Sequence, residues 1–198
     1  MLPDGAPAAF IFDSEAGVVS AWNGQLSPDT SAVTVGGTPG AIYKGLALLH
    51  RHKGAWLLAT DFHNGRIDVL DSGFQPASLP KHAFTDPALP KGFAPFNIAV
   101  IGDRVFVTYA KQDADARATS PARGWASSTS TRADGRLVQH FARRGVLNAP
   151  WGMTIAPRHF GRFTGDRLVG NFGDGRIHAF DPHSGRLQGT LRSAGDND

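Results

Sequence analysis

The chain of 198 residues has no cysteine and only one glutamate, Glu15. The first absence excludes disulfide bonds and thiolate metal sites, and it leaves the redox compartment open. The second absence makes a metal site built on several glutamates hard to assemble. The eight histidines offer no substitute, because none of them has the His-x-x-x-His spacing of a helical zinc site.

Long hydrophobic runs are also missing, so we expect no transmembrane span. The first residues lack the charged region and apolar stretch of a signal peptide, and the residues alone therefore leave the localisation unknown. Helical spacing of apolar residues is equally scarce. Instead, 24 glycines and 13 prolines punctuate the chain, which is typical of many short strands and turns. The length and a hydrophobic content of 41% fit a single domain over residues 1–198.

The basic residues give a net charge of +3 but are scattered along the chain. Arg143 and Arg144 are the only adjacent pair of Lys or Arg residues. A nucleic-acid interface requires basic residues that gather on one face. The distribution therefore favours solvated surfaces over nucleic-acid binding.

One segment occurs twice in the chain. Residues 61–71 read Asp-Phe-His-Asn-Gly-Arg-Ile-Asp-Val-Leu-Asp, and residues 171–181 read Asn-Phe-Gly-Asp-Gly-Arg-Ile-His-Ala-Phe-Asp. A weaker copy begins at Asp13. The pairs Asn64-Gly65 and Asp174-Gly175 favour positive φ at both positions, as a two-residue type I′ turn requires. Because apolar or alternating runs flank each pair, both copies predict a hairpin.

The spacing of these copies defines a longer repeat. Gly17 and Gly65 lie 48 positions apart, and Gly65 and Gly175 lie 110 apart, about two periods of 55. Each unit reads as four short antiparallel strands, which is typical of a β-propeller blade. We therefore expect an all-β fold of about three and a half NHL-like blades, at about residues 8–35 (partial), 42–90, 95–146 and 150–192.

A propeller needs about four to eight blades to close its ring. With fewer blades than that, we expect an incomplete, open propeller and interpret the chain as a fragment of a longer one. The alternative is closure by pairing of residues 10–12 with residues 186–191. An open arc leaves two apolar blade faces uncovered, which favours self-association.

The third unit lacks an alternating strand where the repeat requires one. Residues 125–132 read Trp-Ala-Ser-Ser-Thr-Ser-Thr-Arg, and we do not expect such a Ser/Thr run to fill the interior of a blade. One interpretation is a local frameshift, because residues 126–130 can be encoded as GCT-TCG-TCG-ACG-TCT, and another frame of these codons reads Phe-Val-Asp-Val, a good blade strand. The other interpretation is a divergent loop.

Several stretches together carry a family resemblance: residues 43–47, 59–69, 84–87, 94–98, 107–115 and 168–181. On these, the chain resembles a bacterial family of conserved hypothetical proteins that look like six-bladed NHL-type propellers, some with a PEP-CTERM sorting tail. The resemblance implies a partial member of that family and an exported, extracytoplasmic protein. It implies no catalytic residue.

The candidate ligand-binding residues follow from the blade pattern. First strands line the central channel of a propeller, so Lys44 and Asn97 are expected to point into it, or else to cap strands or bind water. Asp61 and Asn171 close second strands and are further channel candidates. Propellers of the lactonase type hold a divalent cation such as Ca²⁺ with oxygen ligands. Here those ligands would come from Asp13, Asp61, Asn97 and Asn171, although their positions in the repeat differ.

The leading hypothesis is a non-catalytic binding or scaffold module without a cofactor, for a protein or small-molecule ligand. The first alternative is a metal-dependent hydrolase of the lactonase or gluconolactonase type. The second is nucleic-acid binding, as in some NHL propellers. The sequence contains neither a Gly-x-Ser-x-Gly motif nor a phosphate-binding loop. Four or more oxygens at about 2.3–2.6 Å from one point would favour the hydrolase.

Overall fold

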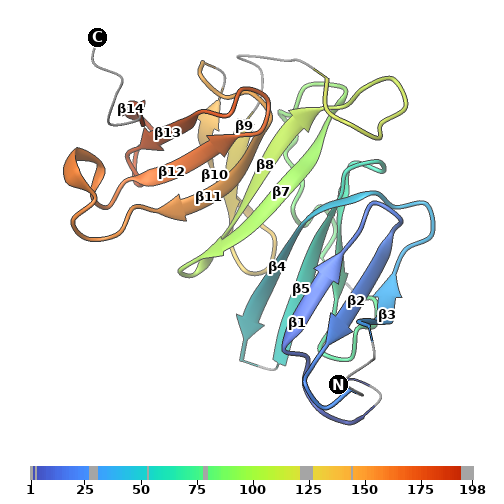
Figure 1. The fold of residues 1–198 in the computed structure, drawn as a ribbon. Coiled ribbons are helices and arrows are strands. Elements are labelled where there is room, and N and C mark those ends of the chain that lie inside the picture. The colour runs from blue at the N-terminus through green and yellow to red at the C-terminus, as the bar shows by residue number, and fades with distance from the viewer. Residues whose placement is uncertain are drawn as a thin grey trace.

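The structure, a computed structural model, is all-β (Figure 1). It describes residues 2, 4–26, 31–52, 54–77, 80–120, 127–143 and 145–192. Within these ranges the strands form four antiparallel sheets, and the single helical element is a short 3-10 turn, η1 (Gly161–Phe163). None of the helical structure described is long and apolar enough to cross a membrane.

The first two sheets have three strands each, in the orders β1-β2-β3 and β4-β5-β6. Their strands are β1 (Phe10–Asp13), β2 (Val18–Trp22), β3 (Val33–Gly37), β4 (Tyr43–Arg51), β5 (Gly54–Asp61) and β6 (Arg66–Leu70). The last two sheets have four strands each, in the orders β7-β8-β9-β10 and β11-β12-β13-β14. Their strands are β7 (Phe93–Ile101), β8 (Arg104–Lys111), β9 (Ser127–Thr131), β10 (Leu137–Arg143), β11 (Pro150–Ile155), β12 (Arg167–Asn171), β13 (Ile177–Phe180) and β14 (Leu187–Thr190).

The strands β4, β7 and β11 form the inner edge of the arrangement, because β7 contacts both β4 and β11. Each begins its own sheet and is followed outward by the later strands of that sheet. The first sheet differs in this respect. Asp13 ends β1 as Asp61 ends β5, so β1 occupies the second-strand position of a blade. The first sheet therefore corresponds to the second, third and fourth strands of a blade, as the sequence predicted for a partial blade.

The four sheets form an open arc rather than a ring (Figure 1). In the described part of the chain, β1 pairs only with β2 and β14 only with β13. The expectation of an incomplete, open propeller is confirmed. The alternative closure, with residues 10–12 beside residues 186–191, is wrong, because those strands lie at opposite ends of the arc.

The hydrophobic core is divided among the junctions between neighbouring sheets. Val19, Leu57 and Leu70 belong to the cluster between the first and second sheets. A second cluster joins the second and third sheets through residues such as Leu58, Val69, Ile98 and Val107. A third joins the third and fourth sheets through Phe106, Phe141, Val169 and Phe180. Alternate residues of a strand point to opposite faces, so each inner sheet contributes to two clusters.

The hairpin turns differ in detail from the prediction. Glycine has positive φ at both Gly65 (+67°) and Gly175 (+68°), as expected. Asn64 and Asp174 do not, so the two-residue type I′ assignment is wrong. The loop between β5 and β6 spans residues 62–65 instead, and Asp61 Oδ1 accepts a hydrogen bond from the Asn64 N–H at 3.2 Å. A longer loop needs only its last residue in the left-handed region.

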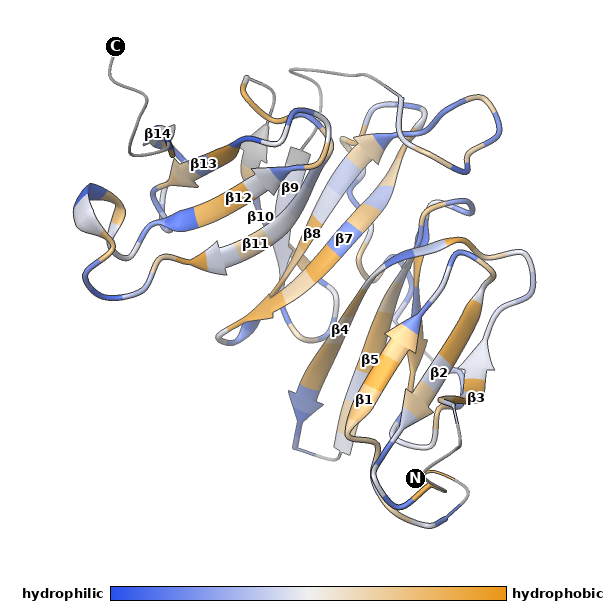
Figure 2. Cartoon of the chain, in the orientation of Figure 1, coloured by the Kyte–Doolittle hydropathy of each residue, from blue (hydrophilic) through white to orange (hydrophobic). Residues whose placement is uncertain are grey.

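The prediction that the Ser/Thr run cannot form a strand inside a blade is also wrong. Residues 125 and 126 lie outside the described residues, but Ser127–Thr131 form β9, which pairs with β8 on one side and β10 on the other, and Ser128 to Thr131 are buried. Figure 2 shows β9 in pale colours beside the more hydrophobic β8. The interpretation as a divergent loop is therefore wrong, whereas the frameshift stays a prediction. The neighbouring strands impose the pairing, and the short side chains fit between the sheets.

Candidate functional site

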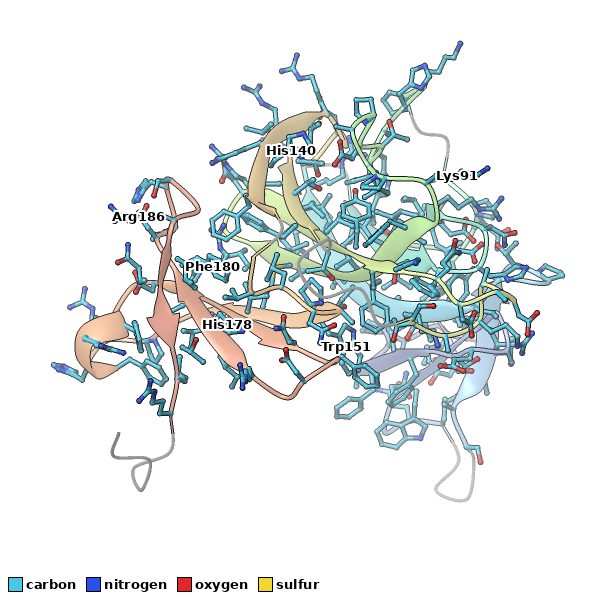
Figure 3. The ribbon with its side chains drawn as sticks, turned by 90° about the horizontal axis from the view of Figure 1, so that it is seen from above. Lys91, His140, Trp151, His178, Phe180 and Arg186 are labelled. Atoms are coloured by element: carbon cyan, nitrogen blue, oxygen red, sulfur yellow. The ribbon has the colours of Figure 1, made fainter. Side chains whose placement is uncertain are left out.

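A pocket of about 520 Å³ lies at the inner end of the arc, where β1 ends and β4, β7 and β11 begin. Figure 3 shows Trp151 at the end of the last sheet that faces the first two sheets. The residues lining the pocket are Asp13, Ser14, Glu15, Tyr43, Lys44, Phe96, Arg117, Ala118, Thr119, Trp151 and Phe172. All four sheets and the loop after β8 thus contribute to one cavity.

Aromatic rings form one wall of this pocket. Phe96 lies 6.3 Å from Trp151 and 5.9 Å from Phe172, measured between ring centroids, and the Trp151 and Phe172 rings meet edge to face at 6.2 Å. Beneath them, the buried Phe62 packs against Phe96 at 5.5 Å. Phe172 is 63% exposed and Trp151 43% exposed. The site therefore keeps two large rings open to solvent on a rigid aromatic support.

Charged side chains form the opposite wall. Lys44 forms an ion pair with Glu15, whose side chain is exposed, and its Nζ lies 6.0 Å from the centroid of the Phe62 ring. Asp13 is half-buried and its Oδ2 has no hydrogen-bond partner. Burial raises the pKa of Asp13 above its ordinary value, because it disfavours the charged carboxylate. The wall thus combines Lys44 with two acidic side chains, and Arg117 adds a second cation to the lining.

Tyr43 anchors this wall to the second sheet. Its hydroxyl donates to Asp68 Oδ2 at 2.9 Å. Burial, with a further contribution from the neighbouring Asp68, raises the Tyr43 pKa to about 12, so the phenol stays protonated at neutral pH. This hydrogen bond fixes the start of β4 and with it the position of Lys44.

The inner strands approach closely beside the pocket at Gly45. A Cβ at this position would lie 2.2 Å from Asn97 Oδ1, so only glycine fits there. Asn97 uses its Nδ2 to donate to the Trp151 carbonyl oxygen at 2.7 Å, and its Oδ1 accepts from the Ile98 N–H at 2.8 Å. Asn97 therefore links β7 to β11 and positions the backbone of Trp151.

The structure separates the residues proposed from sequence for the channel and the metal. Lys44 and Asp13 line the pocket, whereas Asp61, Asn97 and Asn171 do not. Asp61 is fully buried, and its carboxylate accepts from the Ile42 N–H at 3.2 Å and from Asn64 Nδ2 at 2.7 Å. Asn171 donates through Nδ2 to the Val146 carbonyl oxygen at 2.7 Å.

These contacts bear on the metal hypothesis. Asp13 Oδ2 and Asn171 Oδ1 are buried oxygens without partners, and only Asp13 lines the pocket. Among the described residues, no group of three or more His, Asp or Glu side chains could hold a metal ion. This finding concerns carboxylates and imidazoles and not the amide oxygens of Asn97 and Asn171, so the divalent-cation site stays a prediction.

The aromatic wall was missed in the sequence, although signals for it are present. Phe62 and Phe172 follow the last residue of a second strand in the two strong copies of the repeat. Phe96 and Trp151 each follow a proline near the start of a first strand. The recurrence of aromatic residues at equivalent positions of successive blades predicts that they converge at the channel.

Comparisons with known proteins identify relatives in a virus. Uncharacterized proteins of Acanthamoeba polyphaga mimivirus are 32% identical over 185 residues, 36% identical over 148 residues and 33% identical over 190 residues. These alignments cover 90%, 71% and 92% of this chain. The chain spans only 34%, 37% and 46% of the length of those proteins. No family model matches the sequence.

These relatives correct the family resemblance inferred from sequence. The resemblance to a bacterial family is wrong, because the relatives found are viral proteins and no family model supports the bacterial assignment. The expectation of an exported protein depended on that resemblance and loses this support.

Solved structures with the same architecture are β-propellers and related proteins. A gluconolactonase from Xanthomonas campestris aligns with a TM-score of 0.63 and 17% identity over 92% of this chain and 57% of its own. A protein of unknown function from Bacteroides caccae aligns with a TM-score of 0.55 and 11% identity over 94% and 58% of the two chains. The Dos1 propeller aligns with a TM-score of 0.50 and 13% identity over 89% and 42%. At these identities the comparisons show the propeller fold and nothing about activity.

Proposed function

We propose that this chain is a non-catalytic binding module whose ligand is a carbohydrate held in the pocket at the inner end of the arc. The observation that carries the proposal is the pair of exposed rings, Trp151 and Phe172, beside a polar wall. A pyranose ring has an apolar face that stacks on an aromatic ring and hydroxyl groups that need polar partners. The pocket offers both within about 520 Å³, the size of a small-molecule site.

The polar wall supplies the hydrogen-bonding partners that such a ligand requires. Lys44 and Arg117 contribute donors, Asp13 and Glu15 contribute acceptors, and Thr119 contributes both. Asp13 is the most informative of these, because a buried carboxylate oxygen without a partner gains from accepting a ligand hydroxyl. Stacking on the rings and hydrogen bonding to the opposite wall would together orient a sugar in the pocket.

The test is calorimetric titration of the purified chain with a panel of mono- and oligosaccharides. Replacing an exposed ring removes the stacking surface, so Phe172→Ala and Trp151→Ala are expected to weaken binding about tenfold or more. Phe160→Ala is the matched control, because Phe160 is an exposed aromatic residue that does not line the pocket. Absence of saturable binding to every sugar, or equal affinities in all variants, would contradict the proposal.

A metal-dependent lactone hydrolase is the second candidate. It is favoured by the structural similarity to a gluconolactonase and by the unpartnered Asp13 Oδ2 in the pocket. Of its four proposed ligands only Asp13 lines the pocket, which weighs against it. An assay for lactone hydrolysis with Ca²⁺, Mn²⁺ or Zn²⁺ separates the two candidates. Turnover that depends on a cation and is lost in Asp13→Asn would favour the hydrolase over the binding module.

A further inference from the structure

A second cavity, of about 340 Å³, lies between the third and fourth sheets, away from the pocket already described. It is lined by the turn between β7 and β8 (Ile101 to Arg104), by Ser130 of β9 and Gln139 of β10, and by Arg167 of β12. Gln139 Nε2 donates to the His183 carbonyl oxygen at 3.2 Å and so links the two sheets at its rim. The cavity is therefore a defined space between two well-packed blades.

Arg167 is the most unusual residue of this cavity. Its side chain is buried, with a relative exposure of 6%, yet neither Nε nor Nη1 has a hydrogen-bond partner. Its guanidinium carbon lies 3.8 Å from the centroid of the Phe106 ring and 4.2 Å from that of Phe141. The two rings hold the guanidinium in place but cannot accept its N–H bonds as an oxygen would.

A second unpartnered group and a second cation lie around the same space. Ser130 Oγ is buried without a partner and also lines the cavity. Arg104 lines it from the start of β8. Burial and the neighbouring Arg104 lower the pKa of Arg167 to about 10, so the guanidinium remains charged at neutral pH but is poorly compensated. Buried charges of this kind are normally paired with a counter-ion.

We propose that this cavity is an oxyanion-binding site, in which Arg167, Arg104 and the Ser130 hydroxyl bind a phosphate group. An oxyanion would accept the N–H bonds of Arg167 and the Ser130 O–H, and it would neutralise the two facing arginines. A cavity of 340 Å³ has room for more than inorganic phosphate. The ligand class is therefore a phosphate ester or free phosphate. The site is independent of the carbohydrate pocket, and either proposal can fail without the other.

The carboxylate of Asp103 also lines the cavity and gives a test based on charge. Its negative charge opposes an incoming anion, so Asp103→Asn is expected to tighten phosphate binding several-fold. Arg167→Met keeps an unbranched side chain against Phe106 and Phe141 and removes the donors. Because replacing a buried charge by an apolar residue is often neutral or stabilising, this variant is expected to fold.

The experiment is titration of the chain with inorganic phosphate at constant ionic strength, followed by calorimetry and by phosphorus NMR. Wild type is expected to bind saturably, Arg167→Met to lose at least tenfold in affinity and Ser130→Ala to lose several-fold. Arg158→Met, which replaces an exposed arginine outside the cavity, is expected to bind as wild type does. A sugar phosphate titrated in parallel distinguishes an ester from free phosphate by its affinity.

Phosphate salts also stabilise proteins in general, without a specific site. A specific site differs from this general effect because its binding saturates and because it changes in the variants. Saturable binding that responds to Arg167→Met and Asp103→Asn in opposite directions supports the site. A complete lack of saturable binding in wild type, or an unchanged dissociation constant in Arg167→Met, would overturn it.

Discussion

Substitution of Ser130 tests how β9 is accommodated inside the third sheet. Its Oγ is buried and has no hydrogen-bond partner, so the folded state bears an uncompensated desolvation cost. Ser130→Ala removes this group without breaking any hydrogen bond that the structure shows. Ser130→Val removes it and adds methyl groups next to a cavity of about 340 Å³, where there is space for them. A valine also suits a strand better than a serine does.

The magnitudes follow from these two contributions. Removing one buried hydroxyl that has no hydrogen-bond partner raises the free energy of unfolding by about 1 kcal/mol or somewhat more. Two added methyl groups contribute about 0.8 kcal/mol each if they are fully buried. We therefore expect the free energy of unfolding to rise by about 1 kcal/mol in Ser130→Ala and by about 2–3 kcal/mol in Ser130→Val. In a chain of this size, each 1 kcal/mol raises Tm by about 2–4 °C.

Chemical denaturation and thermal melts measure these changes, with Thr108→Val on the adjacent strand as the matched control. Thr108 is equally buried, but its Oγ1 accepts the Asn97 N–H at 3.0 Å. Its loss leaves a backbone donor unpaired, so Thr108→Val is expected to lower the free energy of unfolding by about 1–3 kcal/mol. If Ser130→Val lowers the free energy of unfolding as well, the inference that the unpartnered Ser130 hydroxyl destabilises the folded state is refuted.

Three further predictions concern other parts of the molecule. Gly65→Val is expected to lower the free energy of unfolding by about 1 kcal/mol or more, because φ is +67° there, and an unchanged Tm would contradict this. Phe10 and Phe12, 58% and 51% exposed on the open end of the arc, should drive self-association. The double change to serine should therefore reduce the sedimentation coefficient at high concentration. Burial lowers the pKa of His178 below its ordinary 6.5, so the unfolded chain takes up that proton first. Stability should therefore fall as the pH drops below about 6.5, and His178→Gln should flatten that part of the profile.

The repeat made the blades predictable because a hairpin depends on residue types that lie close together in the sequence. Glycine at the end of each loop and alternation after it define where strands turn, so the strands around Gly65 and Gly175 could be placed directly. The exact turn type could not, since the loop length depends on how Asp61 binds the loop backbone. The strand β9 was not predicted from the sequence, for a different reason. Its pairing is imposed by β8 and β10, while its own residues carry no alternation.

The site was less predictable than the fold. Lys44 was recognised because it begins an inner strand, and it does line the pocket. Asp61 and Asn171 were proposed for their oxygen atoms, yet their contacts are made within their own loops and blade connections. Whether a polar side chain faces a channel or its own backbone depends on rotamers, which no spacing rule encodes. The convergence of Phe96 with Phe172 depends in addition on the curvature of the arc.

The division of the core into separate clusters at the sheet junctions has a consequence for how the molecule opens. The second and third sheets each pack against two neighbours, whereas the first and fourth each pack against one. Stability then resembles that of a linear array, in which the end members fray first. Amide protons of β5 and β8 should exchange with solvent most slowly, and those of β2 and β13 should exchange earlier. A closed ring of blades has no such gradient, so the pattern of hydrogen exchange would report directly whether the arc has been completed by a neighbouring chain segment or partner.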